Sequence, residues 1–562
     1  MLMDFATARD CRVLLDVKVP MRDGVRLSTS IYLPPTADPH PVVLVRTAYN
    51  RVGMQPGPFV KCGLALVVQD CRGRYDSAGE CYPFTSEAED GYDTLEWIGQ
   101  QPWCNGSIGM FGDSYLAATQ FYAAPLGSRY LKALNPRFMA GDPWKRAYYC
   151  DGAFSLALTW SWLCFETSAR TSQAAAMPLF DVRRLLHHLP IVSLDEASGA
   201  GVVPAYRDYV THSQYDEHWK VLDIRDRYSR YTAPALLTGG WYDNYPAEAV
   251  RVFCGLRRHA PTPELRDAHR LLIGPWTHGV NPATSLGELD FGAGSLVEND
   301  ATNRWLDCLL HDGDPADFQQ APVRLFVMGS NQWRDFSDWP PPGTRSLPFY
   351  LRSSGRLSQA LPEAESPDGY TYDPENPAPT LGGNHSVGPY NPGLYEFVKP
   401  GPYDQRPVEE RNDVLVYTSD VLQQDLEVIG PVTVELYAAT STPDTDFVAR
   451  LTDVYPDGRS INIAEGVIRA RFREDVWGTP KLLEPGQTCA YTIDLQVTAN
   501  LFAKGHRIRL QITSSNFPLW DRNLNSGRDP ATDTEIRIAE QIIHHDRAHP
   551  SCLRLPVVPV RG

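Results

Sequence analysis

The sequence predicts an α/β domain that is interrupted by a helical insertion and followed by an all-β domain. Over the first 140 residues, short apolar runs alternate with helix signals, which is typical of a parallel sheet. Aromatic and alanine residues at helical spacing dominate residues 144–230. After the proline cluster Trp339–Gly343, strand runs alternate with Pro and Gly turns. A chain of 562 residues is too long for one core, so several domains are expected.

The first elements follow from local patterns. Asp23–Gly24 predicts a hairpin turn. Pro41–Val45 and Leu64–Val68 are apolar runs bounded by breakers, which predicts two buried parallel strands. Ser86–Glu89 has the pattern of a capping box that opens a helix. Leu131–Leu134 is expected to form the next strand.

The middle of the chain predicts the insertion. Phe154–Phe165 and Ser172–Leu186 carry apolar residues at helical spacing. Sheet signals then resume in Pro234–Gly239 and Leu271–Gly274. A sheet interrupted by helices suggests a cap over the mouth of a site, and a purely structural insertion is the alternative.

The C-terminal part predicts strands, because Val432–Tyr437 and Ile508–Ile512 alternate in polarity and helix signals are few. This pattern favours a sandwich or jelly roll. The predicted domains are an α/β domain over 1–143 and 231–343, a helical cap over 144–230, and a β domain over 344–562.

Charge and composition exclude several classes of protein. The 52 Lys and Arg against 68 Asp and Glu give a net charge of −16, which argues against nucleic-acid and anionic membrane partners. Charges within Met1–Asp10 argue against a signal peptide, and no apolar run approaches a membrane span. Eleven scattered cysteines predict reduced thiols in the cytoplasm. The pairs His187–His188 and His544–His545 lack nearby ligands at metal spacing, so neither a metal nor a cofactor is predicted.

Gly112–Tyr115 is the most informative motif of the chain. An apolar run leads into a glycine, then Ser114, then residues that can start a helix, which is typical of a nucleophile elbow. The usual second glycine is replaced by Leu116, so the motif alone is read more readily as an ordinary turn. Other residues must decide between the two interpretations.

Two loops supply the partners that a serine nucleophile needs. Asp243 and His278 each follow a predicted strand, in the order Ser, Asp, His that α/β-hydrolases use. We therefore predict a triad of Ser114, Asp243 and His278. The backbone N–H of Tyr115 is the expected oxyanion donor, and the Tyr49 hydroxyl, in the loop after an early strand, is the candidate for the second donor.

Several motifs carry a resemblance to a known family. The chain resembles the cocaine esterase family of serine esterases, within the wider group of X-Pro dipeptidyl peptidases and α-amino-acid ester hydrolases. The resemblance implies an α/β-hydrolase domain with an inserted helical cap and a C-terminal jelly roll. It also implies the triad and oxyanion residues named above, without a cofactor. The motifs that carry it are Val45–Tyr49, Gln69–Gly73, Gly109–Leu116, Gly240–Asp243, Ile273–His278, Asp404–Pro407, Asp444–Phe447 and Ser514–Pro518.

The resemblance also bears on the substrate. α-Amino-acid ester hydrolases use acidic groups two and three positions after the catalytic Asp, where this chain has Tyr245 and Pro246, which argues against an obligatory α-amino group. Tyr148, Trp160 and Tyr245 match aromatic pocket positions of cocaine esterases and favour an aryl acyl group. The alternative is that these aromatic residues are core residues of the cap.

Further alternatives stay open at this point. The segment 384–403 is longer than its counterpart in the family and would reshape the leaving-group side of the pocket if it reached the mouth. The expected partner is a small-molecule ester, and a homodimer is left open. The rival functions are an amide-directed enzyme, such as an X-Pro dipeptidyl peptidase or a β-lactam side-chain acylase, and a non-catalytic carbohydrate-binding protein. The chain enters hydrolase signals by about residue 15, which leaves no room for the N-terminal domain typical of the peptidases.

Overall fold

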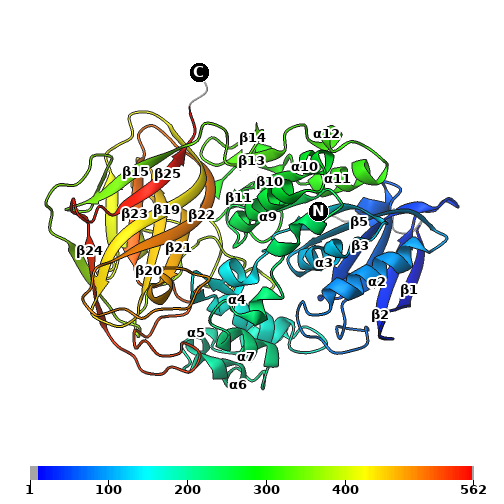
Figure 1. Ribbon diagram of the computed structural model, residues 1–562, viewed down its shortest axis with the longest axis horizontal. Helices are drawn as coiled ribbons and strands as arrows, with labels where there is room; N and C mark the ends of the chain where they lie inside the picture. The colour runs from blue at the N-terminus through cyan, green and yellow to red at the C-terminus, as the bar shows by residue number, and fades with distance from the viewer. Residues whose placement is uncertain (1–10, 560–562) are drawn as a thin grey trace.

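A ten-stranded sheet organises the N-terminal part of the molecule (Figure 1). The computed structural model describes residues 11–559. The strand order is β1-β2-β4-β3-β5-β6-β9-β10-β13-β14. The strands are β1 (Arg12–Pro20), β2 (Arg26–Leu33), β3 (His40–Thr47), β4 (Ala65–Asp70), β5 (Cys104–Asp113), β6 (Leu131–Arg137), β9 (Leu236–Gly240), β10 (Arg270–Gly274), β13 (Val323–Val327) and β14 (Gln332–Phe336).

The centre of this sheet is parallel, as the continuous apolar runs predict. Strands β4, β3, β5, β6, β9, β10 and β13 pair in parallel, and every residue of β4, β9 and β10 is buried. The predicted hairpin is confirmed, because Met21 donates its N–H to the carbonyl of Val25 at 2.8 Å between antiparallel β1 and β2. In this arrangement the loops after β3, β5, β9 and β10 all leave the same edge of the sheet.

Helices cover both faces of the sheet. Helix α3 packs against α2 and β5, and α9 packs against β9, whereas α11 contacts β5 and β6 from the opposite face together with α1. Within residues 11–559, no helix is both long enough and apolar enough to span a membrane. The predicted absence of a signal peptide concerns residues 1–10, which lie outside the described part. The helices are α1 (Gly57–Val60), α2 (Glu87–Gly99), α3 (Tyr115–Ala123), α9 (Pro246–His259), α10 (Pro263–Ala268), α11 (Ala301–Leu310) and α12 (Pro315–Phe318).

The capping box predicted at the start of α2 is wrong in one respect. The helix begins after Ser86 as expected, but the Ser86 side chain makes no capping hydrogen bond. Glu87, the first residue of the helix, turns into the core, where it is 2% exposed and pairs with the guanidinium of Arg46 at 2.5 Å. This ion pair ties the start of α2 to β3 and does not replace the cap, because the acidic residue of the predicted box is Glu89.

Between β6 and β9 the chain forms a segment of short helical pieces, which we call the helical segment (144–230). It is broken into more pieces than the sequence periodicity suggests, and two of these are π-helical turns. A small hairpin of β7 (Tyr149–Cys150) and β8 (Ala153–Phe154) interrupts it. Its pieces are η4 (Trp144–Tyr148), α4 (Leu156–Ser161), η5 (Trp162–Glu166), η6 (Ala174–Leu179), α5 (Val182–Leu186), η7 (Ile191–Ser193), α6 (Leu194–Ala197), α7 (Pro204–Thr211), α8 (Glu217–Lys220) and η8 (Arg225–Arg230).

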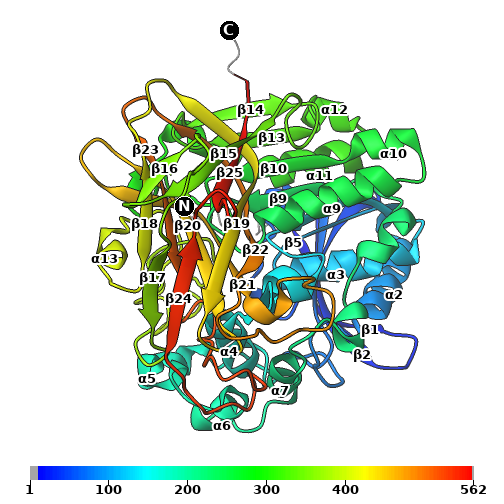
Figure 2. The same cartoon turned by 60° about the vertical axis from the view of Figure 1, so that its left-hand side comes forward.

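The C-terminal part is mostly antiparallel β-structure, as predicted. Figure 2 shows its strands beside the first sheet, with the helical segment below both. The predicted strands at 432–437 and 508–512 lie within β19 and β23. The predicted domain boundaries remain predictions. The strands are β15 (Arg345–Arg352), β16 (Arg356–Ser358), β17 (Asp368–Tyr372), β18 (Leu415–Ser419), β19 (Leu426–Thr440), β20 (Asp446–Val454), β21 (Ser460–Arg469), β22 (Cys489–Phe502), β23 (Arg507–Thr513), β24 (Ala539–His544) and β25 (Cys552–Val557).

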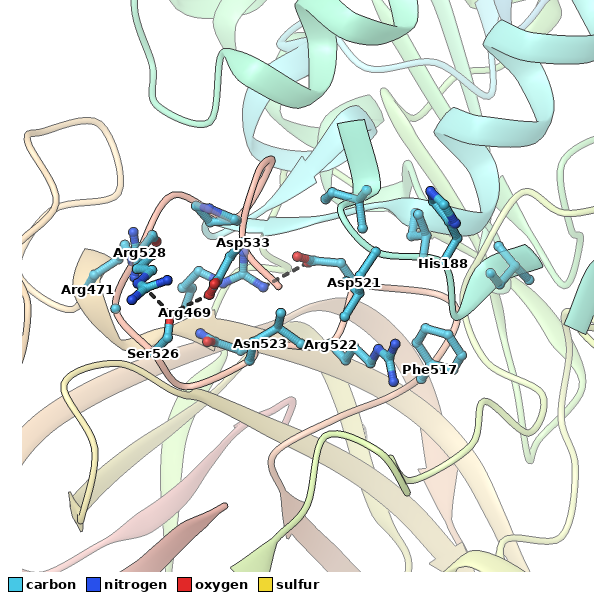
Figure 3. A pocket seen from close by; sticks show the side chains of 17 residues that line it. His188, Arg469, Arg471, Phe517, Asp521, Arg522, Asn523, Ser526, Arg528 and Asp533 are labelled. Atoms are coloured by element: carbon cyan, nitrogen blue, oxygen red, sulfur yellow. Dashed lines mark hydrogen bonds and ion pairs between the residues drawn. The ribbon is translucent and has the colours of Figure 1, made fainter. Parts of the chain in front are cut away.

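A small cavity marks the junction of the helical segment with the C-terminal strands (Figure 3). It measures about 20 Å³, which is room for roughly one water molecule. Beside it the buried guanidinium of Arg469 pairs with Asp446 at 2.9 Å and with Asp521 at 2.8 Å. The carboxyl groups satisfy a cation that would otherwise be buried alone, so this cavity is a structural junction rather than a substrate pocket.

Candidate active site

The chain makes a strained turn at Ser114, between β5 and α3. Ser114 has a φ of 56°, a conformation that residues other than glycine rarely adopt and that nucleophile elbows use. Its N–H donates to the carbonyl of Arg137 at 2.9 Å, which ties the turn to β6. A Cβ on Gly112 would lie 2.2 Å from the Cβ of Leu116, so only glycine fits two residues before the serine.

Asp243 and His278 meet at the same edge of the sheet. Asp243 lies in the loop after β9, and His278 lies in the loop after the adjacent parallel strand β10. The Nδ1 atom of His278 is 2.9 Å from Oδ1 of the fully buried Asp243. Because this bond uses Nδ1, Nε2 is the ring nitrogen that remains available to Ser114, which lines the same pocket.

Tyr49 and Tyr115 flank the serine. The Tyr49 hydroxyl, in the loop after β3, accepts the indole N–H of Trp162 at 2.9 Å, and Tyr49 lines the same pocket as Ser114. Burial raises the pKa of Tyr49, so its hydroxyl keeps its proton at neutral pH. Tyr115 is the first residue of α3, and its backbone N–H follows the serine directly. The structure thus brings both candidate oxyanion donors to Ser114.

A pocket of about 380 Å³ opens above these residues. Most of its walls are aromatic or aliphatic, which is typical of sites for small apolar ligands. The residues that line it are Tyr49, Met54, Phe84, Phe111, Asp113, Ser114, Tyr115, Leu116, Met139, Tyr148, Leu158, Trp162, Glu166, Tyr245, His278, Ser386, Tyr390 and Asn391.

Two of the three predicted pocket aromatics line this pocket, and the third does not. Tyr148 and Tyr245 are in its wall, and the ring centroid of Tyr245 is 5.6 Å from that of His278. Trp160 lies outside it, fully buried, with its indole N–H donated to Ser198 at 3.2 Å. Leu158 and Trp162 face the pocket instead. Positions two residues apart on a helix point to different faces, so Leu158 and Trp162 line the wall while Trp160 between them lies in the core.

Sequence reasoning missed several other wall residues. Phe84 comes from the loop before α2 and carries no motif that would reveal it. Ser386, Tyr390 and Asn391 come from the segment 384–403, which therefore does reach the site. Its unusual length was the signal in the sequence, but length alone could not place it at the pocket.

Two carboxyl groups lie in the pocket wall. Asp113 is paired with Arg137, at 2.5 Å from its Nε atom. Glu166 is 9% exposed and accepts a hydrogen bond from the Ser172 hydroxyl at 2.7 Å. Burial raises the pKa of Glu166 above its ordinary value. Glu166 is therefore the wall carboxyl group that reaches the pocket without an ion-pair partner among the described residues.

The expectation that His544 lacks partners at metal spacing needs correction. Within the described residues, side-chain ligand atoms of His544, Asp546 and His549 lie within 4.8 Å of one another. Asp546 Oδ1, however, already accepts the backbone N–H groups of Ala548 at 2.7 Å and His549 at 2.9 Å. The group is thus accounted for as a hydrogen-bonded turn after β24, outside the pocket.

The chain is similar to known proteins along nearly its whole length. Residues 23–280 match the X-Pro dipeptidyl-peptidase (S15 family) model, and residues 317–554 match the X-Pro dipeptidyl-peptidase C-terminal non-catalytic domain. Cocaine esterase of Rhodococcus sp. (strain MB1 Bresler) is 38% identical, over 97% of this chain and 98% of that protein. A putative serine esterase of Mycobacterium bovis is 27% identical, over 96% of this chain and 94% of its own.

Solved structures agree with this picture. An α-amino acid ester hydrolase superposes with a TM-score of 0.87 at 27% identity, over 99% of this chain and 98% of that chain. An aminopeptidase from a marine sediment archaeon, Thaumarchaeota archaeon, gives a TM-score of 0.86 at 25% identity, over 98% and 97% of the two chains. The resemblance noted from the sequence is confirmed: this chain belongs to the cocaine esterase family of serine ester hydrolases, with an S15-type catalytic domain and a mostly β C-terminal domain.

Proposed function

We propose that this protein cleaves carboxylic esters through an acyl-enzyme on Ser114. The observation that carries the proposal is that one apolar pocket is lined by Ser114 on a strained elbow, by Tyr49 and by His278, and that the buried Asp243 holds His278 from behind through a hydrogen bond. Serine is a weak nucleophile until a base removes its proton, and this arrangement supplies that base.

The first step acylates the serine. His278 Nε2 takes the hydroxyl proton as Ser114 Oγ attacks the ester carbonyl carbon. Asp243 holds the Nδ1–H tautomer and stabilises the imidazolium that forms. The Tyr49 hydroxyl and the Tyr115 N–H donate to the oxyanion of the tetrahedral intermediate. The intermediate collapses with loss of the alcohol, which receives its proton from His278.

The second step returns the free enzyme. A water molecule loses its proton to His278 and attacks the acyl carbon, and the same two donors bind the second oxyanion. The carboxylic acid then leaves as Ser114 Oγ regains its proton from His278. Every proton moves between the substrate, water, Ser114 and His278, so these residues suffice for the cycle.

The acyl group is proposed to be aryl or otherwise apolar. Rings of Tyr148, Trp162 and Phe84 form one wall of the pocket, and flat apolar groups stack well on such rings. Tyr245 stands where an acidic residue would be needed to hold an α-ammonium group, and burial raises its pKa, so it stays neutral. An aryl ester therefore fits this pocket better than an α-amino ester.

The architecture proposed from the sequence completes this picture. We propose that the helical segment acts as a cap over the pocket, since it supplies wall residues Tyr148, Leu158, Trp162 and Glu166. The jelly-roll topology of the C-terminal strands, the boundaries at 143/144, 230/231 and 343/344, and the cytoplasmic location are part of the same proposal.

An amide-directed activity is the second candidate. The S15 family model and the archaeal aminopeptidase favour it, because they describe enzymes that cleave peptides. Hydrolysis of p-nitrophenyl benzoate, compared with that of an X-Pro p-nitroanilide, separates the two. We expect the ester to give the larger kcat/KM by orders of magnitude. Membership of an esterase family leaves the carbohydrate-binding reading without support.

The Ser114→Ala variant tests the central assignment. It is expected to lose ester turnover and covalent labelling by a fluorophosphonate probe. Ser107→Ala, on the same strand β5 but before the elbow, is the matched control and should keep both. Undiminished turnover or labelling in Ser114→Ala would overturn the proposal.

A further inference from the structure

The hydrogen bond between Trp162 and Tyr49 has a fixed direction. An indole N–H can only donate, whereas a phenol carries one hydrogen and can also accept. At this 2.9 Å contact Tyr49 must therefore accept. The hydroxyl hydrogen of Tyr49 then points away from Trp162, and Tyr49 lines the same pocket as Ser114.

The ring of Trp162 is itself held in place. It stacks on Phe84, at a centroid distance of 5.7 Å and an interplanar angle of 21°, and on Tyr148, at 5.8 Å and 25°, and these two rings are themselves 6.4 Å apart. Phe84 in turn stacks on Tyr115 at 4.8 Å and 22°. We call Tyr115, Phe84, Trp162 and Tyr148 the aromatic cluster. The cluster includes the residue whose backbone N–H follows the serine, and its Trp162 holds the Tyr49 hydroxyl.

The aromatic cluster is anchored in the core through Tyr115. The Tyr115 hydroxyl donates to Glu87 at 2.7 Å, and Glu87 pairs with Arg46. Arg46 and Glu87 are 0% and 2% exposed, so this anchor is shielded from water. Offset and tilted ring stacking in such an interior fixes side-chain positions closely.

We propose that Trp162 is a positioning residue of the oxyanion hole: by donating to Tyr49, it directs the Tyr49 hydroxyl hydrogen toward the oxygen on which charge develops. The inference rests on the proposed function, which assigns Tyr49 as an oxyanion donor. Such donors are effective because they are aligned before the reaction, so a hydroxyl free to rotate would lose part of its effect.

The inference gives the helical segment a role in the chemistry. Tyr49 belongs to the loop after β3, whereas Trp162 is the first residue of η5 in the helical segment. The oxyanion hole is therefore aligned only when this segment is seated against the sheet. The helical segment does more than form a wall of the pocket.

Two substitutions at residue 162 test the inference. Trp162→Phe removes the N–H, and replacement of Trp162 by 3-benzothienylalanine removes only the N–H while it keeps the shape of the ring. With p-nitrophenyl benzoate we expect kcat to fall by about 10-fold or more in the benzothienyl variant, with KM changed by less than about threefold, because the bond acts on the transition state. Trp160→Phe is the matched control, since it removes a similar indole bond, to Ser198, outside the pocket.

A double-mutant cycle separates alignment from simple packing. Tyr49→Phe removes the donor, so loss of the Trp162 N–H should cost nothing further in that background. Binding of phenylboronic acid, which forms a tetrahedral adduct with the serine, should weaken by about the same factor as kcat, whereas binding of benzoate should not.

Three outcomes decide the matter. A benzothienyl variant with kcat within about twofold of wild type overturns the inference, and so does a loss that is equal in the wild-type and Tyr49→Phe backgrounds. If Tyr49→Phe alone leaves kcat unchanged, the oxyanion role in the proposed function fails, and the inference fails with it. Covalent labelling of Ser114 by a fluorophosphonate in every variant confirms that the fold and the nucleophile are intact.

Discussion

Replacement of Asp142 by asparagine is expected to stabilise the protein increasingly as the pH rises. Asp142 lies between β6 and the helical segment and is fully buried. Its Oδ1 accepts the backbone N–H of Trp144 at 2.9 Å, and its Oδ2 has no hydrogen-bond partner among the described residues. Burial and the neighbouring carboxylate of Glu248 raise the pKa of Asp142 to about 7, although Arg251 lies 3.7 Å away.

The direction of this pH effect follows from the linkage between proton binding and folding. The native state holds the Asp142 proton up to about pH 7, whereas the unfolded chain releases it near 3.8, so the native state binds more protons between these values. Stability therefore falls as the pH rises through this window. The full shift corresponds to about 4 kcal/mol at 1.36 kcal/mol per pH unit. Between pH 5 and pH 8 the pH passes through about two units of this window, from pH 5 to about pH 7, so wild type loses about 2 to 3 kcal/mol of unfolding free energy.

The asparagine of the Asp142→Asn variant keeps the Oδ1 acceptor but carries no charge. The difference in unfolding free energy between Asp142→Asn and wild type, from urea unfolding followed by tryptophan fluorescence, should thus shift in favour of the variant by about 2 to 3 kcal/mol from pH 5 to pH 8. A difference that stays constant, or that shifts toward wild type as the pH rises, would refute the reasoning.

Asp494→Asn is a control in the same charged region, because the pKa of Asp494 is shifted in the opposite direction to that of Asp142. Burial disfavours the charge on Asp494, but Arg146 and Lys145 outweigh it and lower its pKa to about 2. A carboxylate with a lowered pKa stabilises the fold above its unfolded pKa and loses this effect only as the pH falls below it. The variant should therefore be less stable than wild type by a similar amount at pH 5 and at pH 8.

Two further predictions concern the supports of the site. Gly112→Ala should abolish ester turnover, because the added Cβ would lie 2.2 Å from a side-chain carbon of α3. Gly53→Ala is the control and should keep its turnover, because its Cβ would point into open space. An active Gly112→Ala variant would contradict the close approach. Glu87→Gln should lower the unfolding free energy by about 3 to 5 kcal/mol, because it leaves the fully buried Arg46 without its closest anion. A loss below about 1 kcal/mol, measured by urea unfolding, would show that this ion pair is dispensable.

The sequence alone predicts which residues lie at the edge of the sheet that carries Asp243 and His278, because the signals there are local. Buried parallel strands are continuous apolar runs, and a polar residue directly after such a run must lie at the edge of the sheet. This rule predicts the positions of Asp243 and His278, and the structure joins them at 2.9 Å. No such rule predicts the residues of the pocket wall, because the side chains that face the pocket depend on where an interrupted helix changes its turn.

Trp160 and Trp162 illustrate the difference. Both are large aromatics in one apolar stretch, and periodicity alone cannot say which faces the pocket. The answer depends on a π-helical turn that starts at residue 162, which the spacing of apolar residues does not indicate. The same holds for Glu87, whose buried partner Arg46 lies 41 positions earlier in the chain, so that no local pattern reveals their ion pair.

The pocket combines residues held by the sheet with wall residues that come from two other segments. Ser114, Asp243 and His278 stand on loops at one edge of a single sheet, so their relative geometry is fixed by strand pairing. The walls come from the helical segment, through Trp162, and from the 384–403 segment, through Tyr390. Changes in either segment would alter the shape of the pocket and leave the pairing of His278 with Asp243 untouched. The Trp162–Tyr49 bond is the exception, because there a wall residue also contacts the hydroxyl that we propose as an oxyanion donor.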